Sequence, residues 1–143
     1  MAHLKETIGK YSELIARAAL MASGWQAVSK AETEEPFDIS ARDPGTGEWK
    51  TFQVKTIRDR REDRGFLTVE GRKGDGRPYT PEDVDFFIGV LIGEGDFPRV
   101  WMFDNRGITD YWGPSEREGK RWVEMDLNFM REDFAENNEA EAV

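Results

Sequence analysis

Two short apolar segments joined by a glycine-rich turn limit the fold of this chain more than any other feature. The segments are residues 37–42 and 49–57, and the turn between them reads Asp-Pro-Gly-Thr-Gly over 43–47. Such residues favour tight turns, so the two segments are predicted to pair as a β-hairpin. Side chains alternate across a strand. Phe52 and Val54 should therefore lie on one face, with Gln53 and Lys55 about 6–7 Å apart on the other.

The rest of the chain predicts a helix followed mainly by strands. Residues 3–23 carry apolar side chains at three- and four-residue spacing, and Gly24 follows them, which predicts a helix. Further strands are expected over 25–29, 66–70, 86–92 and 99–104, and loops over 59–65, 71–81 and 106–120. This order predicts an α+β fold in which helices flank a mixed central sheet.

The size of the chain predicts a single domain. It has 143 residues, enough for a hydrophobic core. We place the domain over 1–130 and expect residues 131–143, which are acidic and lack a hydrophobic stripe, to form a disordered C-terminal tail. No apolar run approaches the ~20 residues that cross a membrane, and no signal peptide is visible. We therefore expect a cytoplasmic protein with no membrane partner.

Several classes of catalytic site are excluded or disfavoured by composition. The chain has no cysteine, which excludes disulfides, thiol catalysis and cysteine-based zinc sites. Its one histidine, His3, lies near the N-terminus, which disfavours a histidine-based metal site or a Ser-His triad.

Four features, in this order, resemble the PD-(D/E)XK nuclease superfamily. They are Gly9-x-x-x-Glu13 in the predicted helix, Gly24-Trp25 at its end, Asp38 two residues after Pro36, and Gln53-Val54-Lys55 in place of (D/E)-x-K. The similarity is to the branch of archaeal Holliday junction resolvases and a QxK-type homing endonuclease, and it covers about residues 5–56. The later segment 79–87 also resembles QVKT-type members. Gln53 departs from the family, because most members have an acid there.

The resemblance implies a restriction-endonuclease-like core and a site for Mg²⁺ or Mn²⁺ that hydrolyses DNA. Asp38, the Gln53 side-chain oxygen and the Val54 carbonyl would be the metal ligands, since magnesium prefers oxygen. Lys55 would orient the attacking water or stabilise developing charge. Glu13 would act through water or a second metal, although on a helical wheel it lies almost opposite the apolar stripe and solvated surface is an equal reading. A neutral Gln53 predicts weaker metal affinity than an acid would give.

Charge distribution is consistent with a local contact to DNA. The net charge is −9, yet residues 50–77 hold nine basic and five acidic residues. An acidic body with a basic strip can bind a phosphate backbone there, weakly and in a salt-sensitive way. The candidate nucleic-acid contacts are Arg58, Arg60, Arg61, Arg72, Lys73 and Arg77. A solvated loop of ion pairs is the competing interpretation.

Three functions stay open at this point. The first is a Mg²⁺-dependent DNA endonuclease acting on branched or defined-sequence DNA, which we expect to work as a homodimer or higher oligomer because members of the branch commonly do. The second is a catalytically inactive nuclease-like domain that binds nucleic acid or protein, an alternative that Gln53 favours. The third is a protein-interaction partner that uses the acidic body.

Overall fold

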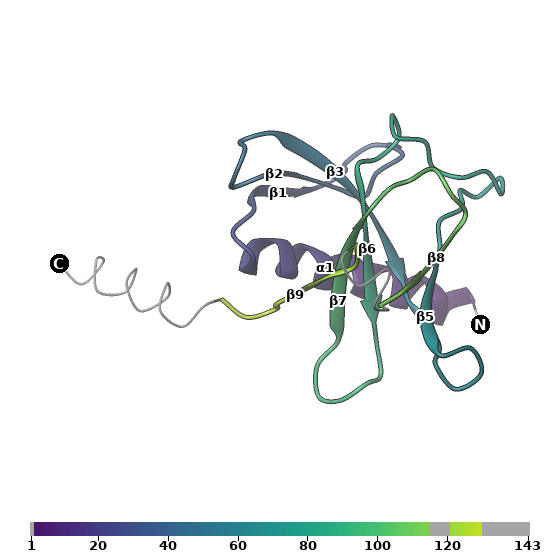
Figure 1. Ribbon diagram of the computed structural model, residues 1–143. Helices are drawn as coiled ribbons and strands as arrows, with labels where there is room; N and C mark the ends of the chain where they lie inside the picture. Colours follow the sequence, from purple (N-terminus) through teal and green to yellow (C-terminus); the bar gives the residue numbers. More distant parts are fainter. Residues whose placement is uncertain (1, 115–120, 130–143) are drawn as a thin grey trace.

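The computed structural model describes residues 2–114 and 121–129 and shows a helix packed on a sheet that a second, smaller sheet covers on its other face (Figure 1). The helix is α1 (Ala2–Ala22). The strands are β1 (Gln26–Lys30), β2 (Ile39–Arg42), β3 (Trp49–Thr56), β4 (Arg58–Arg60), β5 (Phe66–Glu70), β6 (Phe86–Leu91), β7 (Arg99–Asp104), β8 (Asp110–Gly113) and β9 (Val123–Met125). The predicted α+β class is confirmed, and the predicted tail at 131–143 lies outside the described residues.

The larger sheet has six strands in the order β1-β2-β3-β6-β7-β9. β2 and β3 form the predicted antiparallel hairpin, in which Ile39 lies opposite Phe52. β3 then pairs with β6 in parallel, with Gln53 opposite Phe87 and Lys55 opposite Gly89. The remaining neighbours are antiparallel, so the sheet is mixed, as predicted.

The smaller sheet has three strands in the order β4-β5-β8, all antiparallel. Its strands β4 and β8 lie in segments that the sequence predicted to be loops, so these two predictions are wrong. Arg58–Arg60 has no apolar side chain to mark a strand, and it becomes one because β5 pairs with it. β9 was not predicted either, and its three residues pair with β7.

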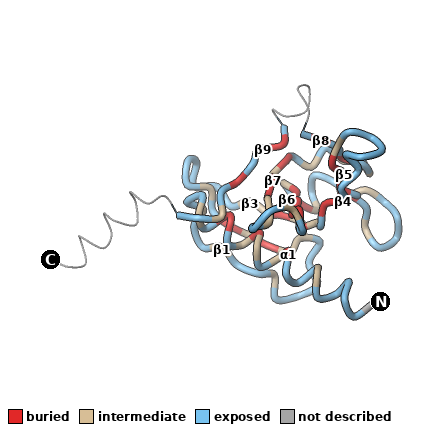
Figure 2. Tube along the Cα trace, turned by 90° about the horizontal axis from the view of Figure 1, so that it is seen from below, coloured by how far each residue is buried: buried red, intermediate tan, exposed pale blue. Residues whose placement is uncertain are grey.

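Alternation along β6 divides the interior into two cores. Ile88 and Val90 pack with Ala16 and Leu20 of α1 in the first core. Phe87 and Leu91 point the other way and pack against the smaller sheet in the second core. A strand buried on both faces explains why 86–92 reads as a continuous apolar run. Buried segments accordingly gather where β3, β6 and β7 cross the centre of the molecule (Figure 2).

The smaller sheet packs directly on the larger one at Gly89, the residue opposite Lys55. A Cβ built on Gly89 would lie 2.9 Å from Ile57 Cγ1 and 3.3 Å from Val69 Cγ2. A side chain at position 89 would therefore force Ile57 to shift, and glycine avoids this. The close packing brings the crossover after β3 down onto the face that carries Lys55.

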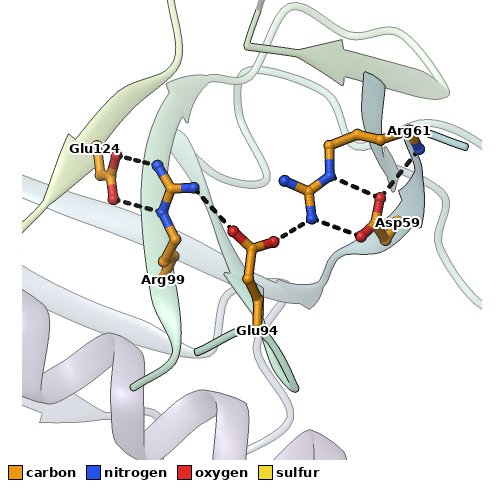
Figure 3. Close-up of polar contacts among 5 residues, drawn as sticks. All are labelled: Asp59, Arg61, Glu94, Arg99 and Glu124. Atoms are coloured by element: carbon orange, nitrogen blue, oxygen red, sulfur yellow. Dashed lines mark hydrogen bonds and ion pairs between the residues drawn. The ribbon is translucent and has the colours of Figure 1, made fainter. Parts of the chain in front are cut away.

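Charged side chains join the smaller sheet to the edge of the larger one (Figure 3). Arg61, after β4, binds Asp59 through two hydrogen bonds of 2.9 and 2.7 Å and also pairs with Glu94. Glu94 in turn accepts a 3.3 Å hydrogen bond from Arg99 of β7. Arg99 donates at 3.0 and 2.7 Å to Glu124 of β9. A chain of alternating charges thus links β4, the β6–β7 turn and β9.

Phe87 is the residue whose loss should damage the second core most. It is fully buried, and its ring centroid lies 5.6 Å from that of Tyr79, 5.7 Å from Phe103 and 5.0 Å from Tyr111. We predict that Phe87→Ala lowers the free energy of unfolding by ~3–5 kcal/mol, measured by urea denaturation. Phe97→Ala is the matched control, since Phe97 is 71% exposed, and it should stay within ~0.5 kcal/mol of wild type. Equal midpoints for the two variants would contradict the second core.

Candidate active site

Asp38 is held against β3 by backbone hydrogen bonds at the entrance to β2. Its N–H donates to the Phe52 carbonyl at 2.9 Å, and its own carbonyl accepts from Ala31 N–H at 2.9 Å. The Val54 N–H donates to Asp38 Oδ2 at 2.9 Å. The carboxylate is therefore fixed beside β3 at Val54, the residue between Gln53 and Lys55. Val54 contributes its N–H to Asp38, while its side chain lies in the first core.

Gln53 and Lys55 are half-buried on the face of β3 opposite Phe52 and Val54, as the alternation predicted. Lys55 Nζ donates to the Arg72 carbonyl at 3.2 Å. The same nitrogen lies 5.3 Å from the centre of the Tyr79 ring, a distance at which a cation is attracted to the aromatic face. The lysine side chain is thus positioned by the loop that follows β5.

Glu13 reaches the same region from α1. It is half-buried and lines a hollow with Lys10, Arg17 and Lys30. The neighbouring Ser12 hydroxyl shares a 2.8 Å hydrogen bond with the Thr56 hydroxyl, which fixes this turn of α1 beside the end of β3. Glu13 therefore lies close enough to Asp38 for their charges to interact.

Burial is the main influence on the ionisation of Asp38 and Lys55. Burial raises the pKa of Asp38, the Val54 N–H opposes that rise, and the nearby Glu13 charge adds to it. Burial lowers the pKa of Lys55, and the charges of Asp38 and Glu70 partly restore it. Two carboxylates near each other in a half-buried place form an arrangement that a bound cation would relieve. A bound cation would favour the ionised form of Asp38, as the charges of Lys55 and Lys30 already do.

The available ligands are oxygens, with few acids among them. Asp38 offers a carboxylate, Gln53 a side-chain amide oxygen and Glu13 a second carboxylate at the edge of the site. Among the described residues, no three His, Cys, Asp or Glu side chains are grouped closely enough to enclose an ion. This set could hold an ion that keeps several of its waters, which is how magnesium commonly binds.

An open hollow of about 350 Å³ adjoins Lys55. Its other lining residues come from the ends of β3, β4 and β5 and from the loop after β5, and they include Arg58, Glu70, Arg72 and Lys73. Glu70 was not among the predicted site residues. A signal for it existed, because it is the polar residue that ends the predicted strand 66–70. Three of the six predicted nucleic-acid contacts thus line one hollow beside the candidate catalytic lysine.

Most of the predicted cationic contacts already have carboxylate partners. The ion pairs are Arg58 with Glu70 at 3.3 Å, Arg61 with Asp59 and Glu94, Arg72 with Asp110 at 3.5 Å, Lys73 with Asp83 at 2.7 Å, and Arg77 with Asp75 at 2.7 Å. Arg61 and Arg77 lie outside the hollow next to Lys55. Exposed ion pairs contribute little energy, so a phosphate could still displace the partners of Arg58 and Arg72.

The fold resembles that of a nuclease of known structure. The chain superposes on a bacterial homing endonuclease with a TM-score of 0.57 and 18% sequence identity, over 75% of this chain and 76% of that one. At this identity the likeness shows the fold alone, and it agrees with the predicted nuclease-like architecture at that level. No known protein family matches the sequence, and no curated protein matches it significantly. No helix in the described part of the chain is long and apolar enough to cross a membrane.

The raised pKa of Asp38 should make the stability of the protein depend on pH. Burial and the charge of Glu13 raise the pKa of Asp38 above the ordinary 3.8. The folded protein therefore loses stability as the pH rises from 3.8 through the raised pKa, because Asp38 ionises less readily in the folded than in the unfolded state. Asp38→Asn keeps an oxygen for the Val54 N–H and cannot ionise. With EDTA present, we predict that the Tm of Asp38→Asn relative to wild type is more favourable at pH 7 than at pH 4. A difference that did not change with pH would argue against this environment for Asp38.

Proposed function

We propose that this chain is a metal-dependent DNA endonuclease of the PD-(D/E)XK kind, which hydrolyses phosphodiester bonds. One observation carries the proposal. The Asp38 carboxylate is held by the Val54 N–H over the strand that presents Gln53 and Lys55. The fold on which these groups lie is shared with a homing endonuclease. This arrangement supports the site of acid, amide and lysine that the resemblance implies.

A hydrated Mg²⁺ or Mn²⁺ fits the donor set of this site. Asp38, the Gln53 amide oxygen and the Val54 carbonyl would be its protein ligands, and Glu13 would contact it through water. Such an ion, when bound, would polarise a phosphoryl oxygen and make a coordinated water more acidic. Burial, and to a smaller extent the charge of Glu13, raises the pKa of Asp38, and a cation beside the carboxylate would oppose both effects.

Lys55 is the group best placed to contact the reacting phosphate. One N–H of the Lys55 ammonium donates to the Arg72 carbonyl, and this hydrogen bond fixes the direction of the side chain. The other N–H groups remain for a phosphate oxygen or an attacking water. Because Lys55 is half-buried, its charge is less screened by solvent than that of an exposed lysine, so it would stabilise developing negative charge more strongly.

DNA is the substrate that the surroundings of Lys55 favour. The adjoining hollow carries Arg58, Arg72 and Lys73, which suits a polyanion at a site in an otherwise acidic protein. We propose branched or defined-sequence DNA as the target. One chain has one such site and a duplex has two strands, so cleavage of both strands would use two copies of the chain.

Gln53 keeps a second function open. A neutral amide where most PD-(D/E)XK members have an acid removes one negative charge from the ligand set. If that loss prevented metal binding, the domain would bind nucleic acid without cutting it. Salt-dependent DNA binding with no cleavage in Mg²⁺ or Mn²⁺ would favour this binding module.

The decisive experiment is a cleavage assay with a matched lysine control. Supercoiled, linear, single-stranded and four-way-junction DNA would be incubated with Mg²⁺ or Mn²⁺, and with EDTA as a blank. We predict that Asp38→Ala and Lys55→Ala each lower the rate ~100-fold or more while the protein stays folded by circular dichroism. Lys50→Ala is the matched control, because Lys50 lies on the same strand as Lys55 and forms an ion pair with Glu48 at 3.0 Å. This variant should cleave like wild type. Full activity in Lys55→Ala would refute the assignment.

Gln53→Glu tests whether Gln53 is a metal ligand. A carboxylate at this position would add a negative charge to the oxygen donors. We predict that Gln53→Glu binds Mg²⁺ or Mn²⁺ more tightly than wild type, by about tenfold in a calorimetric titration, in line with the effect of ligand-sphere changes on metal affinity. Gln53→Asn, which shortens the side chain and keeps it neutral, should bind no more tightly than wild type. Unchanged affinity in Gln53→Glu would place residue 53 outside the ligand sphere.

A further inference from the structure

The outer face of the smaller sheet is aromatic and accessible. Along β5, Leu67 and Val69 point into the second core, so Phe66 and Thr68 point outward. Trp112 of β8 lies opposite Thr68 in register and is 43% exposed. Its ring centroid is 5.6 Å from that of Phe66, with the planes at 42°. An indole supported from one side by a second ring presents its other surface to a ligand.

Arginines surround this aromatic pair. Arg60 lies opposite Phe66 and Arg58 opposite Thr68, so β4 places both beside the rings. Arg64 lines a hollow of about 220 Å³ together with Arg60, Phe66 and Trp112. Within residues 2–114 and 121–129, no carboxylate lies within ion-pairing distance of Arg60 or Arg64. In this respect they differ from Arg61 and Arg77, each of which forms an ion pair with an aspartate two residues earlier in the chain.

This surface continues into the candidate active site. The hollow beneath Trp112 and the hollow beside Lys55 share Arg58 and Glu70 as lining residues. A ligand that lay along the smaller sheet would therefore pass Arg60, then Arg58, and then reach Lys55. Three arginines and two acids, Glu70 and Asp110, line the hollow beneath Trp112. Cations are therefore in excess on the surface that leads to the site, which complements an anionic strand.

We infer that the outer face of the β4-β5-β8 sheet binds single-stranded DNA next to the site of cleavage. An unpaired base stacks on Trp112 beside Phe66, and Arg60 and Arg64 hold the adjoining phosphates. Stacking on an aromatic side chain together with cations along the backbone is how single strands are bound without regard to sequence. The inference deepens the proposed function and rests on it for the identity of the ligand. It assigns to the substrate a region of unpaired strand, as a branched or frayed DNA has.

The test is binding of a fluorescein-labelled oligothymidine of about 12 nucleotides, a length within the usual span of single-strand sites. Anisotropy would be measured in EDTA, so that no cleavage occurs. Trp112→Ala should weaken binding at least about tenfold, and Trp112→Phe should restore most of it. Trp49→Ala is the matched control, because Trp49 is 60% exposed and begins β3, at the end remote from Lys55. Its affinity should equal that of wild type.

A second variant keeps the test valid if Trp112→Ala fails to fold. Arg60→Gln/Arg64→Gln changes only exposed side chains and should lower the dependence of log affinity on log salt by ~1.4, which is ~0.7 for each lost phosphate contact on a single strand. Wild-type affinity and salt slope in this variant would overturn the inference. So would sedimentation showing that Trp112→Ala disrupts self-association, since the patch would then be an interface between copies.

The two proposals can fail separately. Metal-dependent cleavage that needs Lys55, with oligothymidine binding insensitive to Trp112, Arg60 and Arg64, would overturn the single-strand surface and leave the endonuclease intact. Binding that needs those residues, in a protein that cuts no DNA, would support the surface and overturn the endonuclease. Loss of both cleavage of branched DNA and oligothymidine binding in Trp112→Phe would overturn the inference, because that ring can still stack.

Discussion

Parallel pairing between β3 and β6 is the constraint on which the rest of the structure depends. Two parallel neighbours cannot be joined by a tight turn, so the chain must leave the sheet after β3 and return to start β6 at the same end. Here the connection contains β4, β5 and the loop over 71–84. This connection folds over the face that carries Gln53 and Lys55 and packs on Gly89. Its apolar side chains cover the second core, and its polar side chains line the candidate site. The crossover that the parallel pairing requires therefore forms the hollow beside Lys55.

The site places charged groups where burial opposes their ionisation. Lys55 is withdrawn from water between the Arg72 carbonyl and the Tyr79 ring, and Asp38 shares a half-buried place with the charge of Glu13. Each arrangement moves a pKa toward the neutral form of the group, which is a cost to folding. Such costs are common where a protein must bind a cation and an anion together. Hydrogen bonds between Asp38 and the backbone offset part of this cost and hold Asp38 in place.

Carboxylate partners divide the cations of the basic segment into two groups. Arg61 joins the chain of charges that runs through Glu94 and Arg99 to Glu124, so its role is to tie the smaller sheet to β7 and β9. Arg60 and Arg64 are exposed and line a hollow together with Trp112. Position in the sheet, and not the number of charges in the segment, separates the structural arginines from those available to a ligand.

Local pattern alone determined α1, the β2–β3 hairpin and the strands β5 and β7, because helical spacing, alternation and turn residues act between near neighbours in the chain. It also placed Gln53 and Lys55 on one face of β3, since that follows from alternation. Tertiary structure alone decided that Arg58–Arg60 is a strand and that Trp112 is exposed beside arginines. It also brought Glu13, which the sequence left open between a site residue and solvated surface, near Asp38. Each of these depends on contacts between segments far apart in sequence, where the free energy comes from pairing and burial that no local pattern records.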